Sequence, residues 1–363
     1  MERTRRVAPI LALALVATCV QRSNLAAQAN RDPLRSAMAK RIDDDKQGTG
    51  AVVGLLTPQG QSFATYGRIS LGGQEATPDT IFEIGSITKV FTAFLLADMA
   101  ERGEVVLNDP VRKFLPASVT VPSRRGKEIT LADLATQTSG LPRDSVKVDL
   151  NSDTSPYAEY TASELYAFLG SYRLERDPGS KYEYSNVGMG LLGHALALRA
   201  GISYEDLLRR RIFEPLGMTN TTITFNAEQR ARRATGYNVK QLALPPWTGG
   251  VIDPAGSVNS TATDMLKFAA AVIDSKSPLT AAFARMTSVK RPSDNPRSQS
   301  VLGWGMFTLG TNEILGHSGG TFGFQSRLIV DITRKRAVVA WINGQGPAVT
   351  DLVGLALDRP GLQ

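Results

Sequence analysis

The stretch from Val90 to Ala97 constrains the fold most strongly, because it carries no charged side chain inside a predicted helix. The helix lies within IFEIGSITKVFTAFLLADMAERG, residues 81–103. A helix that is apolar nearly all round is not stable on the surface of a globular protein. We therefore expect this helix to run through the protein centre, with other elements packed around it.

Sheet-forming segments lie near both ends of the chain. They are short and rich in β-branched or aromatic residues, and their spacing is typical of an antiparallel meander. The expected strands are GAVVGLLTP (50–58), QSFATYGRI (61–69), VLGWGMFTL (301–309), NEILGH (312–317), FQSRLIVD (324–331) and RAVVAWIN (336–343). The middle of the chain has helical patterns instead, at residues 131–137, 162–169, 188–200 and 204–213.

The simplest arrangement joins both sets of strands in one sheet. This predicts an α+β fold, in which an antiparallel sheet of N- and C-terminal strands is flanked by helices and carries an inserted helical lobe. We place the α/β lobe at about 30–105 and 250–363, and the helical lobe at about 106–249. A cleft between two lobes is where a small-molecule site is expected.

The first residues predict an export signal. MERTRR is basic, and residues 7–20 are uncharged but shorter than the roughly 20 residues that span a bilayer. The small residues Ala27 and Ala29 predict cleavage near Ala29, which makes 1–29 a signal peptide and 30–363 the mature domain, expected to be periplasmic or secreted. Alternatively, Cys19 is retained and acylated as a membrane anchor, although Thr18 is bulky for such a signal.

Composition excludes some chemistry. Cys19 is the single cysteine of the chain, so after cleavage near Ala29 neither a disulfide nor a thiol nucleophile is available. The 41 Lys and Arg only modestly outnumber the 34 Asp and Glu. Basic clusters such as residues 209–211 lack interleaved aromatic residues, so we expect a solvated surface and no nucleic-acid partner. We expect a monomer with a small-molecule or peptide substrate.

The pentapeptide GHSGG (316–320) has the Gly-x-Ser-x-Gly spacing in which α/β-hydrolases present a nucleophilic serine. That arrangement needs an acid and then a histidine later in the chain. The two histidines, His194 and His317, both precede Ser318, and the segments around Ser318 indicate a hairpin. Ser318 is therefore not expected to be the nucleophile.

Ser86 has a more suitable neighbourhood. It lies at the start of the expected central helix, and Lys89 follows three residues later on the same face. At the edge of an apolar core, desolvation disfavours the ammonium and allows Lys89 to act as a base. Backbone N–H groups of the helix N-terminus are available to an oxyanion. Alone, Ser-x-x-Lys is weak, and a capping serine with a snorkelling lysine is the alternative.

Two further motifs support Ser86. KYEYSNVGMG contains Tyr184-Ser185-Asn186 ahead of an expected helix, and GHSGG contains His317-Ser318-Gly319 between two expected strands. This order of motifs resembles the penicillin-recognising serine hydrolases, which include class C β-lactamases and DD-carboxypeptidases. Framework segments also resemble that superfamily, namely residues 78–111, LATQTSGLPR (134–143), FEPLGMTNT (213–221) and GSVNSTATDMLKFAAAV (256–272).

The motifs suggest a separate catalytic or binding role for each of their residues. Ser86 would attack an amide or ester carbonyl, and Lys89 and Tyr184 would share its proton and pass it to the leaving group. Asn186 would hold the substrate side-chain amide. We therefore predict an exported serine hydrolase that forms an acyl-enzyme on Ser86 and cleaves β-lactam or D-alanyl-D-alanine-type amide bonds, without a cofactor.

The third motif contributes substrate contacts. Ser318 would present a hydroxyl to the substrate, and Gly319 would also belong to the substrate-binding residues. By analogy with the superfamily, the backbone N–H groups of Ser86 and Gly320 would form the oxyanion hole.

His317 departs from the superfamily pattern, because class C β-lactamases carry lysine there. Lysine is a permanent cation, whereas a histidine with an ordinary pKa near 6.5 is mostly neutral at pH 7. Histidine at this position also occurs among DD-carboxypeptidases, D-amino-acid peptidases and esterases of the superfamily. We expect His317 to set the preference for anionic substrates, with protonation strengthening that preference.

Three alternatives remain open from the sequence. The first is an esterase or D-aminopeptidase of the same superfamily with the same catalytic residues. The second is a non-catalytic binder, which the three intact motifs disfavour. The third is a metal hydrolase, which is disfavoured because His194 lies in an apolar helical stripe far in sequence from His317.

Overall fold

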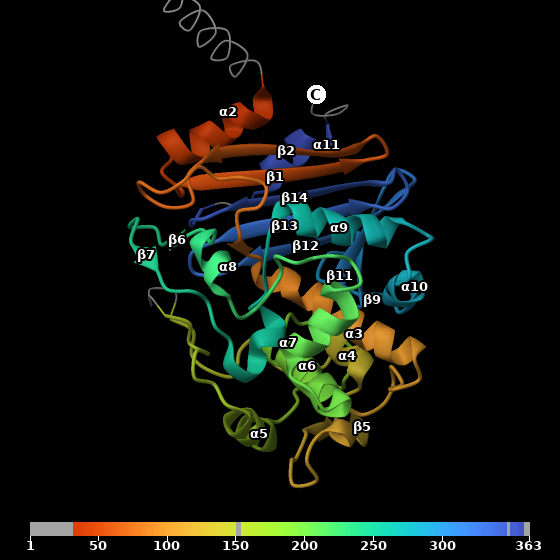
Figure 1. The fold of residues 1–363 in the computed structure, drawn as a ribbon. Coiled ribbons are helices and arrows are strands. Elements are labelled where there is room, and N and C mark those ends of the chain that lie inside the picture. The colour runs from red at the N-terminus through yellow and green to blue at the C-terminus, as the bar shows by residue number, and fades with distance from the viewer. Residues whose placement is uncertain (1–31, 150–153, 347–348, 359–363) are drawn as a thin grey trace, which may run out of the picture.

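The computed structural model describes residues 32–149, 154–346 and 349–358. A single antiparallel sheet of eight strands dominates it (Figure 1). In spatial order the strands are β2 (Gly60–Gly67), β1 (Gly50–Thr57), β14 (Arg336–Ile342), β13 (Gln325–Asp331), β12 (Asn312–Gly320), β11 (Trp304–Leu309), β10 (Ser298–Val301) and β9 (Arg291–Pro292). Strand β1 pairs with β14, so the two ends of the chain share one sheet. The predicted α+β fold is confirmed.

One predicted strand is divided in the structure. VLGWGMFTL was expected to be continuous, but β10 ends at Val301 and β11 begins at Trp304. Gly303 between them has φ of +74°, a conformation that only glycine adopts without strain. A Cβ atom on Gly303 would also lie 2.9 Å from the carbonyl oxygen of Lys89. The turn therefore packs directly on the helix that carries Lys89.

Helices cover both faces of the sheet (Figure 1). Helices α2 (Pro33–Ala39) and α11 (Thr350–Leu357) cover one face, where they enclose a small apolar cluster around Val53 and Val338. Helix α9 (Ala262–Ile273) packs on the opposite face and adjoins the main core. Successive side chains of a strand point to opposite faces of the sheet. Nearly every residue of β1 and β14 is buried, so both faces of these strands are covered.

Helix α3 (Thr88–Glu101) is the central helix that the sequence predicts. Every residue from Thr88 to Met99 is buried. Helix α10 (Thr280–Ser288) packs against α3, and Phe94 of α3 contacts Phe283 of α10 with ring centroids 4.8 Å apart. Since α3 is covered all round, the residues at its start are held between the sheet and the remaining helices.

The remaining elements lie mainly between residues 106 and 260. The helices are α4 (Leu131–Ala135), α5 (Ala162–Ser171), α6 (Asn186–Ala200), α7 (Tyr204–Leu208) and α8 (Ala227–Ala231). Shorter helical segments are η1 (Lys40–Asp44), η2 (Gly85–Ile87), η3 (Val111–Phe114), η4 (Arg209–Phe213) and η5 (Gly250–Ala255). Paired short strands are β3 (Phe82–Glu83) with β8 (Asn259–Ser260), β4 (Ser123–Arg124) with β5 (Lys127–Glu128), and β6 (Gly236–Tyr237) with β7 (Ala243–Leu244).

The helices predicted in the middle of the chain are present. Thr130, Thr161 and Ser203 cap α4, α5 and α7, each accepting a hydrogen bond from a backbone N–H three residues later. The limits of the two lobes stay a prediction, and the predicted signal peptide lies outside the described residues. Among the helices of the described ranges, none is both long and apolar enough to cross a membrane.

Candidate active site

Ser86 and Lys89 meet at the start of the central helix. Ser86 lies in η2, and Lys89 lies in the first turn of α3. The Nζ atom of Lys89 is 2.9 Å from Oγ of Ser86 and 2.6 Å from the carbonyl oxygen of Ala255. The Lys89 side chain is fully buried. The predicted pair is therefore in direct contact, at the place where the helix begins.

Burial holds the pKa of Lys89 well below its usual value, and the nearby positive charge of Arg143 lowers this pKa further. The negative charge of Asp144 acts in the opposite direction but is the smaller influence. A neutral amine has two N–H groups and one lone pair. If one N–H is donated to Ala255, the lone pair is available for the hydroxyl proton of Ser86. The lowered pKa of Lys89 is therefore in the direction that a general base needs.

Two glycines of α6 bring Ala255 to Lys89. Helix α6 packs closely on η5, which ends at Ala255. A Cβ atom on Gly190 would lie 2.5 Å from the Ile252 side chain, and one on Gly193 would lie 2.2 Å from the Pro254 side chain. Neither distance is possible for a real Cβ atom. The absence of side chains at these two positions thus lets η5 approach α6.

Tyr184 lies beside Lys89, just before α6 begins. The ring centroid of Tyr184 is 4.8 Å from Nζ of Lys89. Burial raises the pKa of Tyr184, and a hydrogen bond with the Ser86 side chain only partly opposes this. Tyr184 is therefore a protonated phenol at neutral pH, next to the serine hydroxyl. The structure brings Ser86, Lys89 and Tyr184 together as the sequence predicts.

The loop before α6 is anchored by its neighbours. Ser185 caps the helix, since its Oγ accepts a hydrogen bond from Gly188 N at 2.8 Å. The Ser185 backbone N–H donates to Oε1 of Gln137, and its hydroxyl donates to the carbonyl oxygen of Pro142. These bonds tie the Tyr184 loop to the segment 137–142, so Tyr184 has little freedom to move from Ser86.

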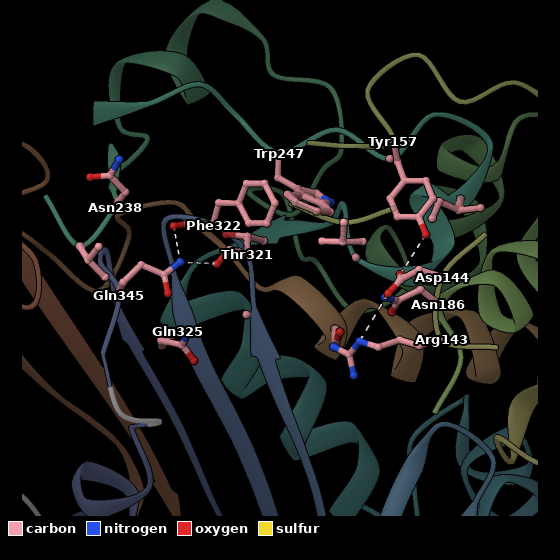
Figure 2. Close-up of a pocket in the computed structure, with 18 of the residues that line it drawn as sticks. Arg143, Asp144, Tyr157, Asn186, Asn238, Trp247, Thr321, Phe322, Gln325 and Gln345 are labelled. Atoms are coloured by element: carbon pink, nitrogen blue, oxygen red, sulfur yellow. Dashed lines mark hydrogen bonds and ion pairs between the residues drawn. The ribbon is translucent and has the colours of Figure 1, made fainter. Parts of the chain in front are cut away.

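Asn186 is oriented by the partly buried carboxylate of Asp144. Its Nδ2 donates to Oδ1 of Asp144 at 2.8 Å, and the hydroxyl of Tyr157 donates to the same oxygen at 2.9 Å (Figure 2). Burial and the charge of Asp144 both raise the pKa of Tyr157, so Tyr157 stays a donor. With one Nδ2 hydrogen committed to Asp144, Asn186 keeps its second Nδ2 hydrogen and Oδ1, and its role toward a substrate amide stays a prediction.

Strand β12 carries the third motif against the start of the central helix. A Cβ atom on Gly319 would lie 2.0 Å from the carbonyl oxygen of Ile84, so only glycine fits there. The neighbouring strand adds a hydrogen bond from Ser326 Oγ to the same carbonyl. GHSGG lies at the end of β12, and the next element is strand β13, so the motif belongs to a hairpin. The prediction that it is not a strand-turn-helix elbow is confirmed.

Ser318 is engaged within the protein. It pairs across the sheet with Arg327, and its Oγ accepts a hydrogen bond from Nη1 of Arg327 at 3.0 Å. Ser318 also lines a cavity beside Ser86, so its predicted role toward the substrate stays a prediction.

His317 faces Tyr184, with ring centroids 6.5 Å apart. Burial is the largest cause that lowers the pKa of His317, to about 4. Its Nδ1 contacts the carbonyl oxygen of Ser318 at 2.7 Å, which suits an N–H donor. His317 is therefore neutral between pH 5 and 8. This lowered pKa argues against a change of substrate preference by protonation in that range, and the role of His317 toward anionic substrates stays a prediction.

Two cavities meet at Ser86. The first has a volume of about 770 Å³, and polar residues around Asp144 face an apolar wall that includes Trp247 and Phe322 (Figure 2). The second has a volume of about 430 Å³ and is lined by Tyr184, His317 and the start of β11. Ser86, Arg143, Gly320 and Gln325 line both cavities. The proposed nucleophile thus lies where a substrate can extend in two directions.

The sequence matches the Beta-lactamase family over residues 35–362. The chain belongs to the beta-lactamase family. A relative is the D-alanyl-D-alanine-carboxypeptidase/endopeptidase AmpH of Escherichia coli strain K12, which is 32% identical over 61% of this chain. The matched region is 56% of the length of AmpH, so the chain spans little more than half of that relative.

Solved structures of the beta-lactamase family have the same fold. A class C beta-lactamase from Rhodobacter sphaeroides superposes with a TM-score of 0.75, at 27% identity over 89% of this chain and 96% of that one. A beta-lactamase/D-alanine carboxypeptidase from Yersinia pestis, complexed with citrate, has a TM-score of 0.76, at 25% identity over 90% and 96%. The predicted resemblance to this superfamily is confirmed.

Several residues of this beta-lactamase family site escaped the sequence reasoning. Arg143 ends the segment LATQTSGLPR, and this position was the available signal for it and for Asp144. Trp247 and Ala255 carry no local pattern, because only tertiary packing brings them to Ser86. Trp247 is held by its backbone N–H, which donates to Oε1 of Glu83 at 2.9 Å.

His194 lies elsewhere. It belongs to α6, and its Nε2 is 2.6 Å from the hydroxyl of Tyr166 in α5. It is partly buried, as a packed helix residue should be, although Leu198, four residues later on the same helix face, is exposed. Within the described ranges, no cluster of three or more His, Cys, Asp and Glu residues is placed to hold a metal ion.

Proposed function

We propose that this protein is a serine hydrolase that forms an acyl-enzyme on Ser86. The observation that carries the proposal is the 2.9 Å contact between Oγ of Ser86 and Nζ of a fully buried Lys89. A buried amine with a lowered pKa can take the serine proton near neutral pH. A serine beside a solvated, protonated lysine would lack this activation.

Acylation follows from the positions of the three side chains. Oγ of Ser86 attacks the carbonyl carbon while its proton moves to Nζ of Lys89. The backbone N–H groups of Ser86 and Gly320 stabilise the resulting oxyanion. As the bond to the leaving nitrogen breaks, Tyr184 gives that nitrogen a proton and is restored by the proton held on Lys89. Water then attacks the acyl carbonyl, and the bond to Ser86 breaks as Oγ regains a proton.

The two cavities suggest how a substrate lies. Tyr184 lines the second cavity and not the first. Since the proton donor must adjoin the leaving group, the leaving group belongs in the second cavity and the acyl group in the first. The amide hydrogen and oxygen of Asn186 are available to the acyl side. β-Lactam or D-alanyl-D-alanine-type amide bonds fit this arrangement, as the names of the relatives suggest.

A mass-spectrometric time course with excess benzylpenicillin tests the proposal. The mature protein, the drug and its hydrolysed form are followed together. Turnover of the drug with a transient adduct on Ser86 is expected of a β-lactamase, and a persistent adduct is expected of a penicillin-binding peptidase. Ser86→Ala should abolish both. An adduct that survives in Ser86→Ala would overturn the assignment of the nucleophile.

An esterase or D-aminopeptidase is the second candidate. It is favoured by the neutral state of His317, since the position that is a cation in class C β-lactamases then attracts no substrate anion. Hydrolysis of an uncharged p-nitrophenyl butyrate without any reaction with benzylpenicillin would favour this candidate. Loss of that hydrolysis in Ser86→Ala would assign it to the same site.

Export belongs to the proposal as well. We infer that residues 1–29 are removed during export and that the protein works in the periplasm or outside the cell. N-terminal sequencing of the protein from its native host tests this, and Asn30 is the expected first residue. A mature protein that begins at an acylated Cys19 would support the membrane-anchored alternative instead.

A further inference from the structure

Arg143 places an exposed positive charge at the junction of the two cavities. Its side chain is 68% exposed, and its Nε lies 3.6 Å from Oδ2 of Asp144. Within the described part of the chain, the two Nη atoms of Arg143 donate no hydrogen bond. A guanidinium with exposed nitrogens in a substrate cleft is suited to bind a carboxylate in a bidentate manner.

The backbone holds this cation near the leaving group. The carbonyl oxygen of Arg143 accepts a hydrogen bond from Asn186 N at 2.8 Å, so the position of Arg143 follows the Tyr184–Asn186 loop. Its guanidinium carbon is 5.0 Å from the ring centroid of Tyr184. Tyr184 is the proposed proton donor to the leaving group. An anion bound to Arg143 would therefore lie close to the atom that departs.

Other cations near the site are not placed beside the proposed leaving group, and Lys240 lines the first cavity only. Arg143 is the only Lys or Arg among the described residues that line the second cavity. Lys89 is buried and directed to Ser86 and Ala255. Arg327 donates to Ser318 and to Thr350, and it lines neither cavity. His317 is neutral.

Two carboxylates near Arg143 weaken its attraction for a bound anion. Asp144 accepts hydrogen bonds from Asn186 and Tyr157, and it lines the first cavity only. Asp294 lines the second cavity, and its charge raises the pKa of Tyr182 while the charge of Arg143 lowers it. Asp294 and Arg143 are therefore both close enough to Tyr182 for their charges to act on it. A bound carboxylate would be attracted by Arg143 and repelled by Asp294.

We propose that Arg143 binds a carboxylate carried by the leaving group of the substrate. Arg143 would then set the preference for anionic substrates that the sequence analysis expected of His317. The inference rests on the proposed function, because it needs the leaving group to lie beside Tyr184. It specifies the substrate class further. The preferred substrates release an amine or alcohol that bears a carboxylate near the broken bond.

A matched pair of esters tests the inference. The two esters are 3-carboxyphenyl phenylacetate and 3-carbamoylphenyl phenylacetate. Both deliver the phenylacetyl group to Ser86, so deacylation is identical for both. Their leaving groups differ in the carboxylate and are otherwise similar. The measured quantity is the ratio of kcat/KM for the two esters. Arg143→Gln should lower this ratio about tenfold, and Arg143→Lys should lower it less, because lysine keeps the charge but loses the fork geometry.

Two more variants define the outcome. Asp294→Asn should raise the ratio about threefold, because it removes the opposing charge at an exposed site. Arg210→Gln removes an exposed positive charge from the helical region and should leave the ratio unchanged. If Arg143→Gln lowers kcat/KM equally for both esters, Arg143 acts on the acidities of Lys89 and Tyr184 rather than on the substrate, and the inference is overturned.

Binding to Ser86→Ala separates this inference from the proposed function. The unreacted esters are titrated into that variant, and the fluorescence of its tryptophans reports binding, since Trp247 and Trp304 line the cavities. Tighter binding of the carboxylate ester, lost in Ser86→Ala/Arg143→Gln, supports the inference without any chemistry. Equal binding of both esters overturns it. If the wild-type protein binds the esters but is not acylated, the proposed function fails while the carboxylate site stands.

Discussion

Gly85 and Gly320 lie backbone against backbone, with no space for a side chain between them. A Cβ atom on Gly85 would be 2.6 Å from the backbone nitrogen of Gly320. Gly85 has φ of +52°, in the left-handed region that favours glycine. Because Ser86 follows Gly85 directly, this contact sets the spacing between the two N–H groups of the proposed oxyanion hole.

We expect Gly85→Ala to slow acylation of Ser86 by about 100-fold, which is the usual effect of losing one oxyanion donor. The new methyl group must displace Gly320, so the second N–H no longer points to the reacting carbonyl. The rate of adduct formation with benzylpenicillin, followed by mass spectrometry, measures the effect.

Gly103→Ala is the matched control for Gly85→Ala. Gly103 has φ of +70°, so the backbone strain is similar, but no atom lies within 4 Å of its Cβ position. Both variants should lose about 1 kcal/mol of unfolding free energy from the strained backbone, and Gly85→Ala should lose more because its methyl group must displace Gly320. Only Gly85→Ala should lose acylation. Equal acylation rates in the two variants would show that the contact with Gly320 is irrelevant to catalysis.

Lys89→Arg should lower the acylation rate by about 1000-fold, because a guanidinium stays protonated and cannot act as the base. In the wild-type protein, the rate should rise with pH as Lys89 loses its proton and then level off. Since burial lowers the pKa of Lys89, this rise should occur well below pH 10.5. A profile of kcat/KM against pH measures it. A rise centred near pH 10.5 would contradict the proposed role of Lys89.

The ratio of kcat/KM for the anionic and the neutral ester should stay constant between pH 5 and 8. The pKa of His317 is lowered to about 4, so its charge appears only as the pH falls toward that value. His317→Lys should raise the ratio about tenfold by adding a permanent cation. His317→Gln, the uncharged control, should leave the ratio unchanged. A ratio that changes with a midpoint near pH 6.5 would refute the neutral state of His317.

The same lowered pKa affects stability. Between pH 6.5 and 4, an unfolded chain binds a proton at His317 that the folded chain does not, so the free energy of unfolding decreases as the pH falls through this window. His317→Gln removes this dependence. Urea unfolding at pH 7 and pH 4.5 should therefore show a larger loss of stability in the wild-type protein than in the variant. Equal losses would contradict the burial of a neutral imidazole.

Local patterns predicted much of the fold. The uncharged run in α3 requires a covered helix, and the alternating or β-branched segments at both ends require a sheet, so both appear where expected. The division of 301–309 was missed because it depends on the close contact between Gly303 and α3. That contact joins segments about 200 residues apart, and no local pattern encodes it.

The site residues that belong to short sequence motifs were predictable. Ser86, Lys89 and Tyr184 meet as expected, since two of them share a helical turn and the third precedes a helix. The neutral state of His317 was not predictable, because a residue's burial depends on packing from distant elements. Arg143 was missed for the same reason, since only the fold places it over Tyr184.

Asn343, which the sequence did not single out, joins three distant segments and should be essential for stability. It is fully buried, and its Oδ1 accepts hydrogen bonds from the backbone N–H groups of Thr49 and Gly50 at 3.0 and 2.7 Å. Its Nδ2 donates to the carbonyl oxygens of Ile69 and Thr235. Asn343→Ala leaves several buried polar groups unpaired, so we expect a loss of about 3 kcal/mol in the free energy of unfolding. Urea denaturation measures it, and the exposed Asn108→Ala should change stability by less than about 0.5 kcal/mol. If the two variants unfold at the same urea concentration, the Asn343 hydrogen bonds do not hold these segments together.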